Sequence, residues 1–322
     1  GSWQTKREMA AMKNSFAGID ILSANQFSRV DIDTVLTTAD EMKRIVEKKG
    51  GSDILKGKIM AALFYEPSSR TFGSFITSMQ RLGGGFIPLQ GMMNSSVAKG
   101  ETLKDTIKTF ASYSDVIVIR HPEVGTAQRA AEVTEIPVIN AGDGIGEHPT
   151  QALLDLYTII EEFGKLENLT ITFFGELAHY RSINSVTRFL SHYPNIRMNF
   201  VSPKEVGLNN ETRKFLKDKD VRFVETENVD DILSETDILY VTRVKKEFLP
   251  EALYKKVQGK YIVDKKLVSK MKKKSIIMHN LPRVGEITED VDNDPRAVYL
   301  KNQMRNGMYV RMALLVLVLG KA

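Results

Sequence analysis

The chain has 322 residues, a length that favours two domains because single hydrophobic cores seldom grow beyond about 250–300 residues. Hydrophobic residues make up 42% and charged residues 26%, and the net charge of +5 suits small anionic ligands better than nucleic acid. Cysteine is absent, which excludes disulfides, thiolate nucleophiles and cysteine-based metal sites. The longest apolar run, residues 312–319, is far shorter than the roughly 18 residues of a membrane span, so we predict a buried helix there.

Short apolar runs alternate with amphipathic stretches along the chain. We predict strands at residues 59–64, 116–119, 138–139, 169–174, 197–201, 221–224, 238–241 and 276–278. Between them lie helical patterns, one of which ends at the three glycines 83–85 and another at Gly164. This alternation is typical of an α/β fold with two doubly wound parallel-sheet domains linked by helices.

The helical pattern over residues 150–164 divides the chain into halves. We expect a first domain over residues 1–150 and a second over residues 151–304. The apolar C-terminal helix, residues 305–322, is expected to pack back on the first domain.

The turn Ser68-Ser-Arg-Thr71 is the most informative segment, because it joins the strand at residues 59–64 to a helical pattern. The first backbone N–H groups of a helix lack internal partners and attract anions. Hydroxyl groups and the guanidinium of Arg70 surround this point, and arginine suits the planar oxygens of a phosphate. We therefore predict a phosphoryl-binding turn; the alternative is an ordinary serine N-cap beside a solvated arginine.

Polar residues follow nearly every predicted strand, where ligands bind in open α/β sheets. Arginines are prominent among them: Arg70, Arg120, Arg181 and Arg243. We expect these groups, from both domains, to converge on one anion-binding crevice.

Several other kinds of site lack their sequence signatures. Residues 175–180 do not have the G-x-G-x-x-G spacing of a dinucleotide site, and neither a Walker sequence nor a G-x-S-x-G elbow occurs. The five histidines lack metal-ligand spacing, so we predict neither a metal nor a cofactor. The remaining arginines, hydroxyls and His148 indicate catalysis by positioning and by stabilisation of developing negative charge.

Seven motifs in order resemble the aspartate carbamoyltransferase family over residues 15–320. They are Glu66-Pro-Ser-Ser-Arg-Thr71, Lys99-Gly-Glu-Thr102, Arg120-His-Pro122, Asn140-Ala-Gly-Asp-Gly144, His148-Pro-Thr-Gln151, Thr242-Arg243 and Leu281-Pro-Arg-Val284. The Ser-x-Arg-Thr turn is shared with ornithine carbamoyltransferases. The ornithine branch typically has a cysteine both in the region of the His-Pro-Thr-Gln motif and in that of the Leu-Pro-Arg motif. This chain has no cysteine, which favours the aspartate branch.

The resemblance implies transfer of the carbamoyl group of carbamoyl phosphate to L-aspartate, giving N-carbamoyl-L-aspartate and phosphate, in pyrimidine biosynthesis. It implies phosphate binding by Ser68, Ser69, Arg70 and Thr71, and contacts to the carbamoyl oxygen from Thr71, Arg120 and His148. Gln151 and the carbonyls of Leu281 and Pro282 are expected to bind the carbamoyl NH₂ group. Arg181 and Arg243, with Lys99 and Lys245, are expected to bind aspartate. The leaving phosphate can accept the amine proton, so no separate base is required.

Residues 94–100 form a polar loop that, by the resemblance, reaches into a neighbouring subunit's site. Ser95 and Lys99 would then act in the neighbour, which implies a homotrimer with shared active sites. We expect a cytoplasmic protein, or an organellar one if a targeting segment has been removed.

Four positions depart from the family pattern. Tyr180 stands where glycine is usual, and its ring could crowd the aspartate site or strain a positive φ. Lys245 replaces a glutamine; Asn280 replaces a proline and is expected to loosen the next loop; Gly285 replaces an acid that would pair with Arg283. Two alternatives therefore stay open: a catalytically impaired structural or regulatory subunit, and a carbamoyltransferase with another amine acceptor.

Overall fold

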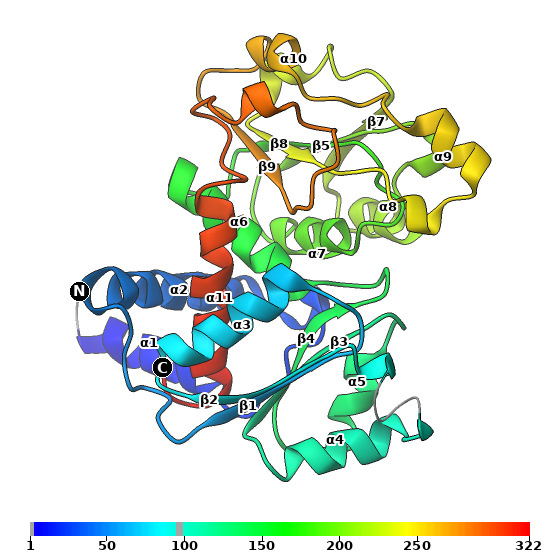
Figure 1. Cartoon of the computed structure of the whole chain (residues 1–322). Helices are drawn as coiled ribbons and strands as arrows, with labels where there is room; N and C mark the ends of the chain where they lie inside the picture. The colour runs from blue at the N-terminus through cyan, green and yellow to red at the C-terminus, as the bar shows by residue number, and fades with distance from the viewer. Residues whose placement is uncertain (1–2, 95–98) are drawn as a thin grey trace. The chain divides into compact units, whose positions relative to one another are not determined.

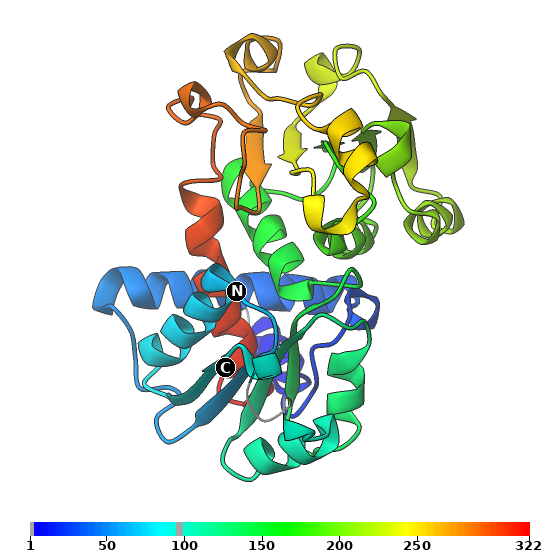
Figure 2. The same cartoon turned by 45° about the vertical axis from the view of Figure 1, so that its right-hand side comes forward.

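The computed structural model describes residues 3–94 and 99–322, which form two compact units. Unit 1 consists of the chain up to Tyr157 together with Asn306–Ala322, and unit 2 consists of Thr158–Arg305. Each unit contains its own parallel sheet, as the prediction of a two-domain α/β fold requires (Figures 1 and 2). The boundary expected at residues 150 and 151 lies within helix α6 (Pro149–Phe163).

The sheet of unit 1 has four parallel strands in the order β2-β1-β3-β4. They are β1 (Ile59–Phe64), β2 (Gly85–Gln90), β3 (Val116–His121) and β4 (Val138–Asp143). The predictions for β1, β3 and β4 are confirmed, but β2 was missed. It begins at the last of the three glycines that end the preceding helix, and as an edge strand it tolerates Pro88.

Helices cover both faces of this sheet (Figure 1). They are α1 (Trp3–Asn14), α2 (Arg29–Lys49), α3 (Ser69–Arg81), α4 (Leu103–Ala111), α5 (Thr126–Ala131), the start of α6 and most of α11 (Asn302–Val318). Ile107 of α4 and Ala127 and Ala130 of α5 pack with Ile117 of β3 on one face. Residues 312–318 of α11 are fully buried, which confirms the prediction of a buried C-terminal helix.

The sheet of unit 2 has five parallel strands in the order β7-β6-β5-β8-β9. They are β5 (Thr170–Phe174), β6 (Arg197–Val201), β7 (Arg222–Thr226), β8 (Ile238–Val241) and β9 (Ile276–His279), all at predicted positions. The helices are the end of α6, α7 (Arg181–Leu190), α8 (Asn210–Asp218), α9 (Glu251–Val257), α10 (Lys265–Ser269) and the first residues of α11. Phe173, Phe200 and Tyr240 pack in the core on one face of this sheet.

Helix starts differ in a way that bears on the site. The side chains of Ser28, Thr102, Asn209 and Asp264 cap α2, α4, α8 and α10. By contrast, α3 and α7 follow Ser68 and Tyr180, neither of which makes a side-chain capping hydrogen bond. The helices α5 and α9 also lack one, but they follow Gly125 and Pro250, whose side chains cannot cap. Thus α3 begins uncapped although a serine is in place to cap it.

Candidate active site

The carboxyl edge of the unit 1 sheet brings together two predicted site residues. Arg120 lies at the end of β3, in register with Phe64 at the end of β1. Its Nη1 donates to Ser68 Oγ at 3.2 Å, and its Nε donates to Glu66 Oε1 at 2.9 Å. The hydroxyl of Ser68 therefore contacts a guanidinium instead of capping α3.

The predicted phosphate-binding turn forms the first turn of α3. Ser69, Arg70 and Thr71 are its first three residues; Ser69 and Arg70 are exposed, whereas Thr71 is buried. The positive end of the helix dipole and the guanidinium of Arg120 thus lie on either side of Ser68. This arrangement suits an oxyanion with several negative charges.

His148 is buried and directly precedes α6, and its carbonyl accepts a hydrogen bond from the N–H of Ala152 at 3.2 Å. The loop before it is closed by Asp143, whose Oδ1 accepts from the Glu147 N–H at 2.8 Å. The second carboxylate oxygen of Asp143 accepts from the Gly125 N–H at 2.9 Å. These bonds hold the start of α6, and His148 with it, at the carboxyl end of β4.

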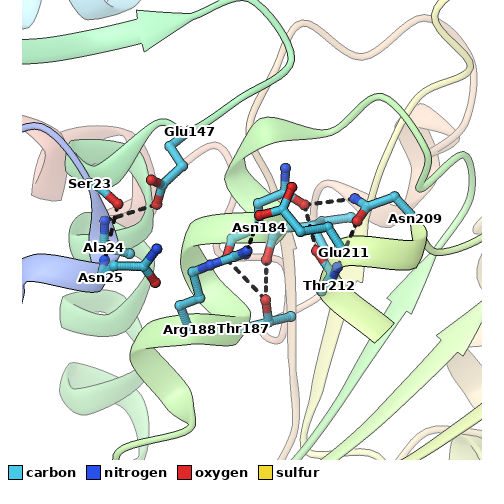
Figure 3. Close-up of polar contacts among 11 residues, drawn as sticks. Ser23, Ala24, Asn25, Glu147, Asn184, Thr187, Arg188, Asn209, Glu211 and Thr212 are labelled. Carbon is cyan, nitrogen blue, oxygen red and sulfur yellow. Dashed lines mark hydrogen bonds and ion pairs between the residues drawn. The ribbon is translucent and has the colours of Figure 1, made fainter. Parts of the chain in front are cut away.

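Two further contacts tie this loop to its surroundings. Gly144 has φ +55°, and a Cβ there would lie 2.4 Å from the carbonyl oxygen of Pro122, so the close approach requires glycine. The carboxylate of Glu147 accepts a hydrogen bond from the N–H of Ala24 at 2.8 Å (Figure 3). The N-terminal segment is thereby anchored beside His148.

A buried arginine that the sequence did not indicate lies behind this site. Arg311 of α11 donates from Nη1 to Ser74 Oγ at 2.8 Å and from Nη2 to Thr150 Oγ1 at 3.2 Å. Ser74 Oγ in turn donates to the carbonyl of Thr71 at 2.9 Å. One guanidinium therefore connects the predicted phosphate-binding turn of α3 with the start of α6, two residues beyond His148.

The charge of Arg311 is only partly balanced. Burial, and then the nearby positive charge of Arg120, lower the pKa of Arg311, while Asp155 acts in the opposite direction. Among the residues that the structure describes, its Nε has no hydrogen-bond partner. The carboxylate of Asp155 also accepts from Gln151 Nε2 at 3.2 Å, so this predicted substrate-binding side chain belongs to the same buried cluster.

In unit 2, the predicted aspartate-binding arginines follow β5 and β8, which are neighbouring strands. Arg181 is the first residue of α7, and Arg243 comes two residues after the end of β8. The guanidinium of Arg243 pairs with Glu247, with Nη2 2.6 Å from Oε1. This hydrogen bond, acting against burial, raises the pKa of Arg243, and the pKa of Glu247 is lowered by the same contact.

Lys245 lies close to both arginines. Its Nζ donates to the carbonyl of His179 at 2.9 Å. Burial, and then the charge of Arg181, lower its pKa to about 8, with Arg243 adding to the effect. Three cationic side chains therefore gather at the carboxyl ends of β5 and β8.

Tyr180 has φ −101°, so the backbone strain that we considered for a bulky residue there does not arise. The side chain is buried inside unit 2, and burial raises its pKa.

The loop after β9 is held firmly, which contradicts the expectation that Asn280 loosens it. Asn280 Nδ2 donates to Tyr240 Oη at 2.6 Å and to Ser182 Oγ at 3.0 Å, and its Oδ1 accepts from Gln303 Nε2 at 3.1 Å. Three side-chain hydrogen bonds of Asn280 thus hold the loop at a position where a proline would restrict the backbone.

Leu281 and Pro282, whose carbonyls are predicted to bind the carbamoyl group, follow directly and are joined by a cis peptide bond. The Leu281 N–H donates to His279 Nδ1 at 2.7 Å, and His279 Nε2 lies 2.6 Å from Glu286 Oε1. Burial acts to raise the pKa of Glu286, but its contacts with His279 outweigh burial and lower it. The loop is therefore folded around a buried His279–Glu286 pair.

The expectation that glycine at position 285 deprives Arg283 of a charge partner was wrong. Arg283 pairs with both carboxylate oxygens of Asp292, which also accepts from Tyr299 Oη at 2.6 Å. The acidic partner of Arg283 is therefore Asp292, seven residues after position 285, where an acid was expected.

Of the residues predicted to act in a neighbouring subunit, Lys99 is exposed and Ser95 lies outside the described residues. Within residues 3–94 and 99–322, no group of three histidine, aspartate or glutamate side chains could hold a metal ion. In the same residues, no helix has the length and apolar character needed to cross a membrane.

Two family models match consecutive parts of the chain. "Aspartate/ornithine carbamoyltransferase, carbamoyl-P binding domain" matches residues 20–161, and "Aspartate/ornithine carbamoyltransferase, Asp/Orn binding domain" matches residues 167–318. The chain belongs to the aspartate/ornithine carbamoyltransferase family. The resemblance inferred from the motifs is thereby confirmed.

Similar proteins carry names from the aspartate branch of this family. A chloroplastic aspartate carbamoyltransferase of Arabidopsis thaliana is 47% identical over 93% of this chain and 77% of its own length. Multifunctional protein pyr1-3 of Dictyostelium discoideum is 48% identical over 95% of this chain, which spans only 14% of that protein.

Solved structures agree in fold. Aspartate transcarbamoylase of Trypanosoma cruzi, in complex with carbamoyl phosphate and aspartate, matches with a TM-score of 0.90 and 39% identity, over 95% of this chain and 98% of that one. The catalytic subunit of the M. jannaschii aspartate transcarbamoylase matches with a TM-score of 0.86 and 45% identity, over 92% of this chain and 96% of that one.

Sequence reasoning missed several residues that support the predicted site. Glu66 begins the first of the seven motifs and His279 directly follows a predicted strand, but neither was assigned a role. Arg311 and Glu286 gave no comparable signal, since their contacts depend on how α11 and the segment after β9 fold back.

Proposed function

We propose that the chain is an aspartate carbamoyltransferase. It transfers the carbamoyl group of carbamoyl phosphate to the amine of L-aspartate and releases phosphate and N-carbamoyl-L-aspartate, a step of de novo pyrimidine biosynthesis. Support comes from the family models, from relatives with this name and from the similar solved structure that contains both substrates.

The single observation that carries the phosphate-binding part is the uncapped start of α3. The Ser68 hydroxyl accepts a hydrogen bond from Arg120 instead of capping the helix, and Arg70 lies in the first turn of α3. A helix start of this kind, with an arginine in it, suits a phosphate. Arg120 and the buried Arg311 add positive charge on the same side of unit 1.

Unit 2 supports an anionic acceptor. Arg181, Arg243 and Lys245 are close enough for both arginines to lower the pKa of the lysine. Such a cluster suits the two carboxylates of aspartate, and it would repel the side-chain ammonium of ornithine.

The chemistry follows from these groups. Attack of the neutral aspartate amine on the carbamoyl carbon places negative charge on the carbonyl oxygen, to which Thr71, Arg120 and His148 are proposed to donate. Donors of this kind typically contribute about 10²–10³ in rate each. The C–O bond to phosphate then breaks, and the leaving phosphate takes the amine proton.

Gln151, with the carbonyls of Leu281 and Pro282, is proposed to orient the carbamoyl NH₂ group. Arg181, Arg243 and Lys99 are proposed to contact aspartate.

Steady-state carbamoylation with aspartate, ornithine and other amines tests the proposal, together with calorimetry using N-(phosphonacetyl)-L-aspartate. We expect turnover with aspartate and tight binding of the analogue. Binding without turnover would indicate an impaired structural or regulatory subunit, and turnover only with another amine would indicate a different acceptor.

We also propose a homotrimer whose sites are shared, with Ser95 and Lys99 acting in the neighbouring subunit. Mixing inactive Lys99→Ala and Arg120→Ala proteins, after dissociation and reassociation, should restore about a quarter of the sites. A mixture that stays inactive while forming trimers would contradict shared sites.

The proposed compartment is the cytoplasm, or an organelle if the native protein carries a targeting segment. Cell fractionation with an antibody against the chain distinguishes the two; recovery in a membrane pellet after a salt wash would contradict both.

A further inference from the structure

Two loops at the carboxyl edge of the unit 2 sheet carry the proposed aspartate-binding arginines. Residues 175–180 lead from β5 to Arg181, and residues 242–248 follow β8 and include Arg243. The loops touch at their start: Gly175 has φ +129°, and a Cβ there would lie 2.5 Å from the carbonyl oxygen of Thr242. Thr242 Oγ1 also donates to the Glu176 carbonyl at 2.7 Å.

Tyr180 joins the loops a second time. Its side chain is 9% exposed, and its Oη accepts a hydrogen bond from the backbone N–H of Arg243 at 2.8 Å. The residue that directly precedes Arg181 therefore fixes the backbone of Arg243. Glycine at this position could not make the contact.

Lys245 joins them a third time, from the opposite loop. Its Nζ lies 4.3 Å from the centroid of the Tyr180 ring and donates to the His179 carbonyl at 2.9 Å. A desolvated ammonium over an aromatic ring is attracted by the ring electrons. Beside it, the rings of His179 and Phe248 stack with centroids 5.5 Å apart and planes 8° apart.

Two of the four departures that we identified in the sequence therefore contact each other. Tyrosine in place of glycine supplies a ring and a hydroxyl, and lysine in place of glutamine supplies the cation that lies over that ring. Each substitution makes use of the other, so they form one structural feature.

We propose that Tyr180 and Lys245 form a cross-loop clasp that holds Arg181 and Arg243 in position for a dicarboxylate acceptor. Both are positioning residues, which act through the two arginines. The amine of Lys245 is already engaged by a carbonyl and a ring, so its effect on aspartate is indirect. This inference rests on the proposed function and goes beyond it, because it assigns the acceptor side to a pair of residues.

A double-mutant cycle on the full chain tests the clasp. We expect Tyr180→Gly and Lys245→Gln each to raise the KM for aspartate about tenfold, with the KM for carbamoyl phosphate within about twofold of wild type. The double variant should be no worse than the more impaired single variant, because the second change removes a contact that is already lost. Effects that multiply would overturn the pairing and would favour direct binding of aspartate by Lys245.

The chain offers a matched control. Lys246 is the exposed neighbour of Lys245, and its Nζ lies 5.7 Å from the centroid of the Tyr254 ring. Lys246→Gln removes the same charge and the same kind of contact without touching Tyr180. It should leave the KM for aspartate within about twofold of wild type.

Hydrogen exchange gives a readout that does not depend on activity. Tyr180→Phe keeps the ring and loses only the acceptor of the Arg243 N–H, so exchange at that amide should become about tenfold faster while the core of the unit 2 sheet stays protected. Unchanged exchange would overturn the clasp. If the wild type shows this protection but does not carbamoylate aspartate, the proposed function fails and the clasp stands.

Discussion

Both units place cationic side chains near the carboxyl edge of a parallel sheet, but they position these side chains in different ways. In unit 1, secondary structure places the start of α3 and Arg120 next to each other. The buried Arg311 holds the first turns of that helix from behind, through Ser74. In unit 2, Arg181 also begins a helix, but Arg243 lies in a loop whose backbone N–H donates to the side chain of Tyr180 in the neighbouring loop. The four departures from the family pattern fall in unit 2, at Tyr180, Lys245, Asn280 and Gly285. Two residues that contact each other across loops can be substituted together. A helix start with a buried charge behind it tolerates fewer substitutions.

Two buried arginines sharpen this contrast. Arg311 in unit 1 and Arg188 in unit 2 are 3% and 5% exposed, and in both the Nε has no hydrogen-bond partner in the part of the chain that the structure describes. Arg188 links α7 to α8, through the carbonyl of Asn184 and the carboxylate of Glu211 (Figure 3). Arg311 instead links two helix starts that carry proposed site residues. Although the two arginines are similarly buried, we therefore expect replacement of Arg311 to reduce activity more than replacement of Arg188.

Removing the first-turn arginine of α3 should have the largest effect. We expect Arg70→Ala to lower kcat/KM for carbamoyl phosphate about 10³-fold or more, because a charge-assisted contact to phosphate is lost. Calorimetry with N-(phosphonacetyl)-L-aspartate should show a matching loss of affinity. Unchanged affinity would remove the phosphate assignment.

Replacing the buried arginine of α11 should have the next largest effect. Arg311→Met is expected to raise the KM for carbamoyl phosphate between about tenfold and a hundredfold, since positive charge and the link between α3 and α6 are lost together. The melting temperature should also fall, because the buried carboxylate of Asp155 loses a nearby positive charge. Arg188→Met is the matched control, with kinetic constants near wild type. Equal kinetic losses in both variants would contradict the contrast between the units.

The amine of Lys245 should make stability depend on pH. Because burial lowers its pKa to about 8 from 10.5, the unfolded chain holds the proton to higher pH, and stability rises as pH increases through this window. Relative to Lys245→Met, the wild-type free energy of unfolding should gain about 3 kcal/mol between pH 7 and about pH 10.5.

Denaturant titrations of both proteins across this pH range measure the difference. The charged neighbours of the amine, Glu176, Arg181, Arg243 and Glu247, are common to both proteins, so the difference isolates Lys245. Parallel pH profiles would show that the amine is not desolvated.

The contact between Glu147 and the N-terminal segment should have the smallest effect. Glu147→Ala removes the acceptor of the Ala24 N–H and is expected to cost about 1 kcal/mol of stability and a few-fold in kcat through His148. Glu147→Gln keeps an acceptor oxygen and should recover most of both. Failure of the glutamine variant to recover stability would point to a role for the negative charge.

The sequence predicted the fold well wherever the pattern was local. Strands such as β1, β6 and β8 match the prediction in both bounds, because apolar runs between turn residues determine them. The strand β2 was missed because glycines 83–85, the last of which begins the strand, indicated only the end of α3.

The site could be predicted only in part. Ser68 and Arg120 were expected at one sheet edge and lie in contact there. The contacts of Arg311, the pairing of Tyr180 with Lys245 and the hydrogen bonds of Asn280 depend on tertiary packing that no spacing in the sequence reveals. The effects expected of Tyr180 and Asn280 were therefore wrong when each residue was considered alone, because the structure gives both residues hydrogen-bond partners.

The helix α11 has a consequence for biosynthesis. Residues 306–322 are made after the whole of unit 2, yet they complete the core of unit 1 and supply Arg311 to it. During translation, unit 1 therefore lacks this helix until the ribosome has finished unit 2. Until α11 is made, the apolar residues that it covers lack their packing partner, and exposed apolar surface makes a ribosome-bound chain prone to misfolding and a target for chaperones.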